Sequence, residues 1–274
     1  MFRHPIITLT IVLLSGYLFT GVKPSQAEGD ETYLYTSTSG LPFDIIRPED
    51  PSSFVCLVAD GRRKHRIWDQ RYDSEPEIKA HSFYAFFRDG HKIEIVVNPE
   101  FGSEAAARHE ASRYVKPLGQ LPIALRRGIQ RFSVHKGNER LHAGVGQIVV
   151  YADMIGRRLA ESDLEEAVFH EAVHASLDAL HRQTPAWLDA QKKDGGFLTR
   201  YGMKFPDRED FAETAIIAYG LFRHPERISP EESGKIEAAV PHRLAFLKGL
   251  LSAEDVYPEL SPDVLAFCPD AKVY

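Results

Sequence analysis

The chain has 274 residues, 43% of them hydrophobic, with 33 Lys or Arg against 39 Asp or Glu and a formal net charge of −6 at pH 7. This length and composition fit one folded domain with appendages. An acidic chain without a clear basic patch is a poor nucleic-acid binder, so nucleic acid is excluded as a partner.

The first 27 residues have the pattern of a secretory signal peptide. Arg3 lies in a weakly basic start, Pro5–Thr20 is apolar, and Ser25–Ala27 is a small-x-small cleavage site. We expect an exported protein, periplasmic or extracellular, whose charge becomes −8 because Arg3 and Lys23 leave with the leader. The alternative is a retained membrane anchor. The apolar run is short for a span of about 20 residues, so we expect no stable membrane span after cleavage.

Residues 28–99 are predicted to form a β-rich N-terminal extension. Strand signals are dense from residue 53 onward, and the segments Ser82–Phe87 and Lys92–Val97 flank Asp89 and Gly90. An Asp-Gly pair between two such segments is a strong hairpin signal.

The two cysteines, Cys56 and Cys268, are too far apart in sequence to form a metal-binding or redox pair of the C-x-x-C type. In an oxidising compartment they could join and tie the extension to a C-terminal tail, residues 255–274. Two free buried thiols are the alternative.

Residues 100–254 are expected to form an α+β core with a small mixed sheet. Glu104–Tyr114 has the pattern of a helix, and Gln130–His135 and Gln147–Tyr151 have the pattern of strands. Further along, Ser229 caps a helix that Pro241 should divide.

The most informative segment is His170-Glu171-Ala172-Val173-His174, an H-E-x-x-H pattern. On a helix, residues four apart share a face, so the imidazoles of His170 and His174 can bind one Zn²⁺ ion. Glu171 lies beside that face, where its carboxylate can act as a general base toward water. The alternative is a core helix that carries two histidines by chance.

The flanking sequence predicts the helix that this motif needs. Ser162 followed by Glu165 reads as a capping box, and acidic residues crowd the first turn. No Pro or Gly occurs between Ser162 and Gln183.

A catalytic zinc site usually has three protein ligands and one open position. Positions 177 and 180 are both Leu, which excludes the longer H-E-x-x-H-x-x-G-x-x-H pattern. A second predicted helix presents Glu209 and Glu213 on one face, the first of them 35 residues after His174. One carboxylate can be the third ligand and the other can support the site. The alternative is an ordinary acidic helix start.

With H-E-x-x-H-A followed by Glu209-Asp210-Phe211-Ala212-Glu213, residues of about 100–225 resemble the anthrax lethal-factor-like zincins, which include the Pro-Pro endopeptidases. The resemblance implies a zincin-like fold, with Glu209 as the third zinc ligand. It also implies that Glu213 supports the ligands without binding the metal ion itself. It also implies a tyrosine that donates a hydrogen bond to the transition state. The family places that tyrosine seven residues before the ligand Glu, where this chain has Gly202, so the role falls on Tyr201.

Together these features predict a secreted or periplasmic zinc-dependent endopeptidase that acts on a protein or peptide substrate. We expect the strand Gln147–Tyr151 to be the edge that binds substrate, with Gly146 and Gln147 nearest the scissile bond. An interior strand is the alternative. For the function as a whole, the alternative is a non-catalytic zinc-binding scaffold with a zincin fold.

Overall fold

A six-stranded mixed sheet, in the order β1-β2-β3-β4-β6-β5, forms the centre of the fold. The structure is a computed structural model that describes residues 33–251 and 257–271. The predicted leader, residues 1–27, lies outside the described residues.

The strands are β1 (Phe54–Arg66), β2 (Glu77–Phe87), β3 (Lys92–Val97), β4 (Arg131–His135), β5 (His142–Gly144) and β6 (Gln147–Tyr151). The α-helices are α1 (Glu104–Ser112), α2 (Val115–Gln120), α3 (Ile123–Arg126), α4 (Ala152–Glu161), α5 (Leu164–Ser176), α6 (Pro185–Asp194), α7 (Arg200–Lys204), α8 (Asp210–Arg223), α9 (Pro230–Ala239), α10 (Pro241–Leu251) and α11 (Pro262–Leu265). A π-helical turn, η2 (Asp178–Arg182), follows α5.

The pairing of the strands confirms the α+β class. β1, β2 and β3 pair in antiparallel fashion, β3 pairs with β4 and β4 with β6 in parallel, and β5 is antiparallel to β6. The predicted hairpin between β2 and β3 is confirmed, with Gly90 at φ +82° where L side chains are rarely found. The strands of segment 28–99 therefore share one sheet with those of segment 100–254.

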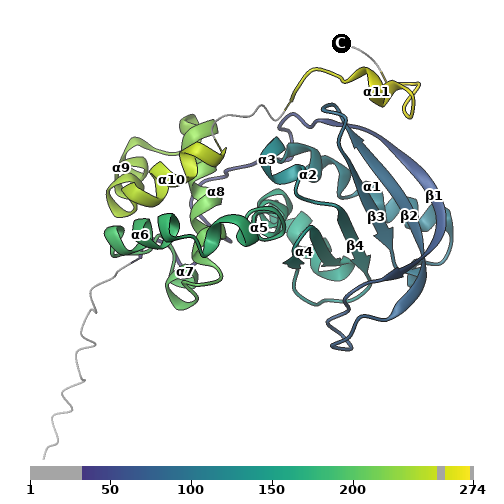
Figure 1. Ribbon diagram of the computed structural model, residues 1–274, viewed down its shortest axis with the longest axis horizontal. Coiled ribbons are helices and arrows are strands. Elements are labelled where there is room, and N and C mark those ends of the chain that lie inside the picture. Colours follow the sequence, from purple (N-terminus) through teal and green to yellow (C-terminus); the bar gives the residue numbers. More distant parts are fainter. Residues whose placement is uncertain (1–32, 252–256, 272–274) are drawn as a thin grey trace, which may run out of the picture. The chain divides into compact units, whose positions relative to one another are not determined.

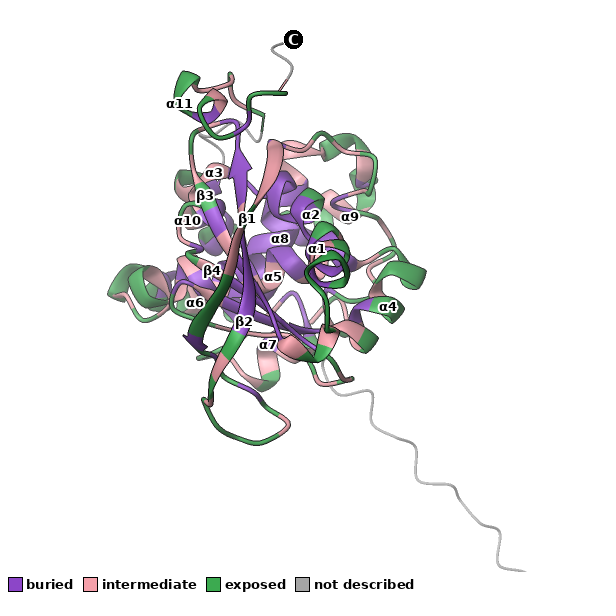
Figure 2. Cartoon of the chain, turned by 90° about the vertical axis from the view of Figure 1, so that its right-hand side faces the viewer, coloured by how far each residue is buried: buried purple, intermediate pink, exposed green. Residues whose placement is uncertain are grey.

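Helix α5 lies between the sheet with α1–α4 and the group of helices α6–α10 (Figure 1). It contacts α2, α3, β5 and β6 on one side and α8 on another, so its side chains Val168, Phe169, Ala172 and Val173 are all buried. Figure 2 shows buried residues gathered along the central strands and on α8, whereas α4 is largely exposed. Burial on both sides explains why the H-E-x-x-H helix is apolar around most of its circumference.

The start of α5 differs from the prediction. Ser162 does not cap it: this residue ends α4 in the left-handed conformation, at φ 58° and ψ 34°. Asp163 is the residue that precedes α5, and it makes no side-chain capping bond there. The capping-box interpretation failed because a separate helix, α4, occupies the preceding residues.

The prediction that β6 is the edge strand is wrong. Gln147 pairs with Arg131 of β4 on one side and with Gly144 of β5 on the other. Among the residues that the structure describes, the three-residue strand β5 is the edge of the sheet next to β6, and β1 is the opposite edge. Gly146 forms the turn between β5 and β6 at φ +71°, and its amide donates to the carbonyl of Ala175 at 2.8 Å.

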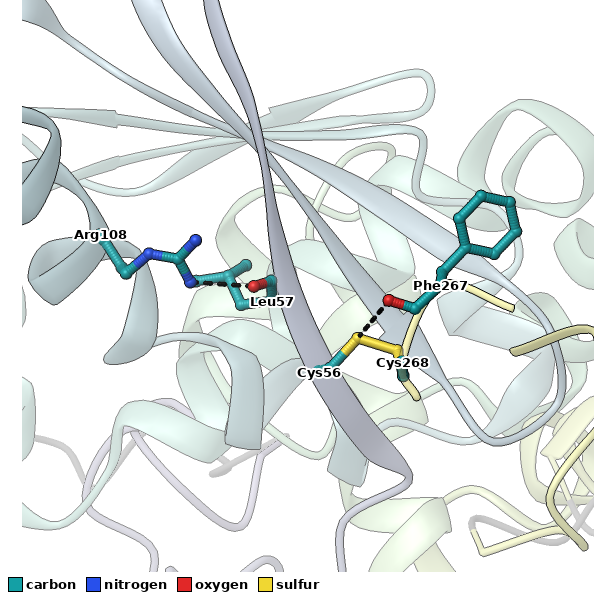
Figure 3. Close-up of a disulfide and its surroundings, with 5 residues drawn as sticks. All are labelled: Cys56, Leu57, Arg108, Phe267 and Cys268. Atoms are coloured by element: carbon teal, nitrogen blue, oxygen red, sulfur yellow. Dashed lines mark hydrogen bonds between the residues drawn. A yellow bond between two sulfur atoms is a disulfide. The ribbon is translucent and has the colours of Figure 1, made fainter. Parts of the chain in front are cut away.

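A disulfide joins Cys56 of β1 to Cys268, with Cα atoms 5.9 Å apart. Figure 3 shows this bond on one side of β1, whereas Arg108 donates to the carbonyl of Leu57 from the other side. The disulfide thereby attaches the C-terminal segment with α11 to one face of the sheet. On this face, Phe86 of β2 packs against Val264 of α11.

No helix in the described ranges is long and apolar enough to cross a membrane.

Candidate metal centre

Three side chains from two helices converge at one point. His170 and His174 project from α5, and Glu209 precedes the first turn of α8, which packs against α5. The two Nε2 atoms are 3.1 Å apart, and Oε2 of Glu209 lies 3.4 Å from His170 Nε2 and 3.3 Å from His174 Nε2. This group could hold a metal ion.

The separations of these three atoms agree with a tetrahedral site. Ligand atoms about 2.0–2.1 Å from a tetrahedral zinc ion are about 3.4 Å from one another. The observed separations of 3.1–3.4 Å are close to that value. The two imidazoles and the carboxylate are each about 15% exposed, so the site is shielded but open to solvent.

A carboxylate lies beside the Nδ1 atom of each imidazole, on the side of the ring away from Glu209. Asp178 Oδ2 lies 2.8 Å from Nδ1 of His174, and Glu213 Oε1 lies 3.4 Å from Nδ1 of His170. Asp178 can accept the Nδ1 proton of His174 through this hydrogen bond, and Glu213 faces the corresponding atom of His170, so the Nε2 lone pairs of the neutral imidazoles are directed toward Glu209. Two lone pairs and an anion facing one another repel unless a cation or a proton lies between them.

The contacts within the centre shift the pKa values of His174 and Glu209 in opposite directions. Burial opposes charge on His174, but hydrogen bonds to Asp178 and Glu209 outweigh it and raise the pKa of His174 to about 10. Burial also opposes ionisation of Glu209, yet hydrogen bonds from His170 and His174 hold its pKa well below the ordinary range. These shifts favour a proton on His174 at neutral pH, and a metal ion would have to displace it.

Glu171 lies beside the ligands on α5 and is half-buried. Burial raises the pKa of its carboxyl, and the nearby His170 and His174 act in the opposite direction. A carboxylate with a raised pKa is well suited to accept and return a proton near neutral pH.

Tyr201 reaches the same site from α7. Burial, followed by the charge of Glu209 and a hydrogen bond to it, raises the pKa of the Tyr201 hydroxyl, so this group stays protonated and can donate. The neighbouring Gly202 allows α7 to approach α8 closely, because a Cβ atom there would lie 3.2 Å from Cα of Asp210. The close approach explains why a side chain at position 201, rather than 202, faces the centre.

The start of α8 is fixed by a buried ion pair that the sequence did not indicate. Arg243 of α10 donates to both carboxylate oxygens of Asp210 at 2.7 and 2.8 Å, and it also binds Asp194 at 3.0 Å. Both Arg243 and Asp210 are at most 1% exposed. Because Asp210 follows Glu209 directly, this pair holds the third candidate ligand in place.

Two cavities meet at the centre, of about 410 and 420 Å³. Both are lined by Leu141, His170, Glu171 and Tyr201. The first extends toward α4, and the second extends along His142–Val145, the edge strand and its turn.

A third cavity, of about 560 Å³, continues the first one outward. The two share Ser39, Met154, Arg158, Asp163 and Glu166. We call the three cavities together the site groove, and the candidate ligands lie within its length rather than at one end.

The structure therefore brings together most of the predicted site: His170, Glu171, His174, Tyr201, Glu209 and Glu213. Gly146 and Gln147 are not among the described residues that line the two cavities at the centre, and Gln147 instead faces a separate hollow with Tyr84 and Arg131. Residues His142–Val145 line the second of these cavities instead. Asp178 was missed, although its spacing of four residues from His174 on a helix is a readable signal.

Comparison of the chain with protein-family models, with curated proteins and with solved structures finds no match.

Proposed function

We propose that this chain is a zinc-dependent endopeptidase with a zincin-like catalytic centre. The observation that carries the proposal is the convergence of His170, His174 and Glu209 at 3.1–3.4 Å, with Glu171 beside them. A site built only to hold a metal ion would have no need of that carboxylate, whereas hydrolysis requires a general base.

Zinc suits the donor set better than the other common metal ions in proteins. Two imidazole nitrogens and one carboxylate oxygen are a frequent catalytic zinc set, and calcium or magnesium would require more oxygen ligands. When bound, zinc would act as a Lewis acid and lower the pKa of water at the open position.

The proton transfers fall to Glu171. Its carboxylate accepts a proton from the attacking water as the oxygen–carbon bond forms at the peptide carbonyl. It then returns that proton to the amide nitrogen as the carbon–nitrogen bond breaks. The products are a carboxylic acid and an amine, and Glu171 ends in its starting state.

Tyr201 is placed to stabilise the oxygen that gains charge during the attack. Its hydroxyl is protonated at neutral pH and borders both cavities that meet at the centre. A fixed donor at that position favours the tetrahedral state over the planar amide.

The site groove supports an internal cleavage site in an extended chain. Because the groove continues on both sides of His170 and Glu171, substrate residues can be bound before and after the scissile bond. Strand β5 borders one side, and its outer edge is unpaired in the described part of the sheet. A substrate could add to this edge as a further strand, so His142–Val145 replace Gly146 and Gln147 as the proposed substrate-binding residues.

Two further observations fit the proposal. The order α5 and then α8, with Glu209 and Glu213 on successive turns, supports the resemblance to the lethal-factor-like zincins. The disulfide between Cys56 and Cys268 is typical of exported proteins and supports a periplasmic or extracellular location.

A peptide library incubated with the purified protein tests this function. We expect cleavage within the peptides, loss of cleavage on treatment with a zinc chelator, and recovery when zinc is added back. Stoichiometric zinc without cleavage of any peptide would instead favour a metal-binding scaffold.

A further inference from the structure

The segment Leu34–Ser39, which we call the strap, runs beside α7 at the metal centre. The amide of Arg200 donates to the carbonyl of Tyr35 at 2.8 Å, and the amide of Tyr201 donates to the carbonyl of Thr36 at 3.1 Å. The amide of the residue proposed as a hydrogen-bond donor, and the amide of the residue before it, are thus bound to the strap.

Thr38 of the strap makes two hydrogen bonds to Glu213. Its hydroxyl donates to Glu213 Oε1 at 2.7 Å, and its amide donates to Glu213 Oε2 at 3.0 Å. Thr38 is 6% exposed and Glu213 is 2% exposed, so water cannot readily replace either bond.

The oxygen that accepts the Thr38 hydroxyl is the one that faces His170. Glu213 Oε1 lies 3.4 Å from Nδ1 of His170, whose Nε2 faces the metal position. Thr38, Glu213 and His170 therefore form one chain of contacts from the strap to the metal ligand. These three residues are far apart in sequence but adjacent here because the strap crosses the start of α8.

We propose that Thr38 is a positioning residue for the metal centre: it fixes the carboxylate of Glu213, which in turn fixes the imidazole of His170. The inference rests on the proposed metal site but goes beyond it, because it makes the N-terminal strap part of that site. Ser37, Thr38 and Ser39 also line the first cavity, so the strap contributes one wall of the site groove.

The energetic argument concerns the buried carboxylate. Without the Thr38 hydroxyl, Oε2 of Glu213 still accepts a hydrogen bond from the backbone amide of residue 38. Oε1 would then have only His170 as its neighbour. The carboxylate then has more freedom to rotate away, and the imidazole loses its fixed orientation. Loss of such supporting contacts typically weakens metal binding about 10–100-fold. Because Thr38 acts on His170 only through Glu213, we expect a loss at the lower end of this range.

The test measures zinc affinity by competition with a chromophoric chelator, in the full chain. Thr38→Val removes the hydroxyl and keeps the size, and we expect about 10-fold weaker binding. Thr38→Ser keeps the hydroxyl and should bind within about twofold of wild type. Thr36→Val is the matched control, because Thr36 is exposed and has no side-chain hydrogen bond in the described structure, so its zinc affinity should not change.

A double variant separates positioning from a general loss of stability. If Thr38 acts through Glu213, then Thr38→Val should cause no further loss of zinc affinity in a Glu213→Gln background. If Thr38→Val does not fold, Thr38→Ala removes the hydroxyl without placing a methyl group against the carboxylate.

The outcomes distinguish this inference from the proposed function. Wild-type affinity in the folded Thr38→Val or Thr38→Ala protein would overturn the role of Thr38 and leave the metal site intact. An equal loss in the presence and absence of Glu213 would also overturn it. Failure of the wild-type chain to bind zinc at all would instead overturn the proposed function.

Discussion

Asp178 lies four residues after His174, and its Oδ2 atom is 2.8 Å from the Nδ1 atom of that histidine. Arg182 in turn binds Asp178 at 3.2 Å, on the same π-helical turn η2. The turn that follows α5 thus supports one candidate ligand, as Glu213 of α8 supports the other. Single π-helical turns are frequent at functional sites, and this one supplies the support for His174.

Replacement of Asp178 by Ala should weaken zinc binding about 10–100-fold, because His174 loses the acceptor that fixes its tautomer and orientation. Zinc affinity is measured by chelator competition. Asp189→Ala is the matched control, since it removes an exposed carboxylate paired with Lys193 away from the site. Equal affinities for the Asp178 and Asp189 variants would show that Asp178 does not support the ligand.

Glu209, which directly precedes α8, and Glu213, in the first turn of α8, should differ in how much they contribute to zinc binding. Glu209→Gln replaces a ligand oxygen, so we expect near-complete loss of bound zinc. Glu213→Gln disturbs only the support of His170, with an expected loss of about 10–100-fold. Metal content after dialysis, determined by atomic absorption, ranks the two variants. The opposite ranking would move the third ligand to Glu213.

Replacement of Tyr201 by Phe should lower turnover about 10²–10³-fold and leave zinc content unchanged, because one donor to the developing oxyanion is lost. Steady-state kinetics on a cleaved peptide measure this effect. Tyr72→Phe serves as the control, since Tyr72 is 66% exposed and is not among the residues that line the site groove. Unchanged turnover in Tyr201→Phe would exclude the hydroxyl as the donor.

Glu166 should make stability depend on pH. Burial raises its pKa from 4.5 to about 7, although the amides of Ile45 and Ile46 donate to it. Between these two values the folded protein binds a proton that the unfolded chain has lost. The stability contributed by this group therefore falls as the pH rises through that window.

Glu166→Gln removes this penalty, so it should raise the free energy of unfolding relative to wild type more at pH 8 than at pH 5. Urea denaturation at both pH values measures the difference. Glu161→Gln, an exposed change on α4, is the control. A Glu166→Gln effect of equal size at both pH values would contradict the assignment.

Much of the site could be predicted from the sequence because its signals are local. The spacing of His170 and His174, and that of Glu209 and Glu213, is the spacing of one helical face, and all four side chains meet in the structure. The hairpin at Gly90 was likewise readable from a turn signal between two strand patterns.

The parts that could not be predicted depend on contacts between distant segments. Thr38 reaches Glu213 across 175 residues, and no local pattern marks such a pair. Strand β5 has three residues, too few for a period-two signal, so the edge of the sheet was placed one strand too late in the chain, at Gln147 of β6. Ser162 satisfied a capping pattern, but the helix before it determined its conformation instead.

The measurement that tests the central claim most directly is zinc content and peptide hydrolysis in Glu171→Gln beside the wild-type protein. Glu171 lies next to the ligands without being one, so the variant should retain stoichiometric zinc. Without a carboxylate to accept the proton from water, hydrolysis should fall to the background level. Hydrolysis at the wild-type rate in a zinc-loaded Glu171→Gln protein would contradict the account.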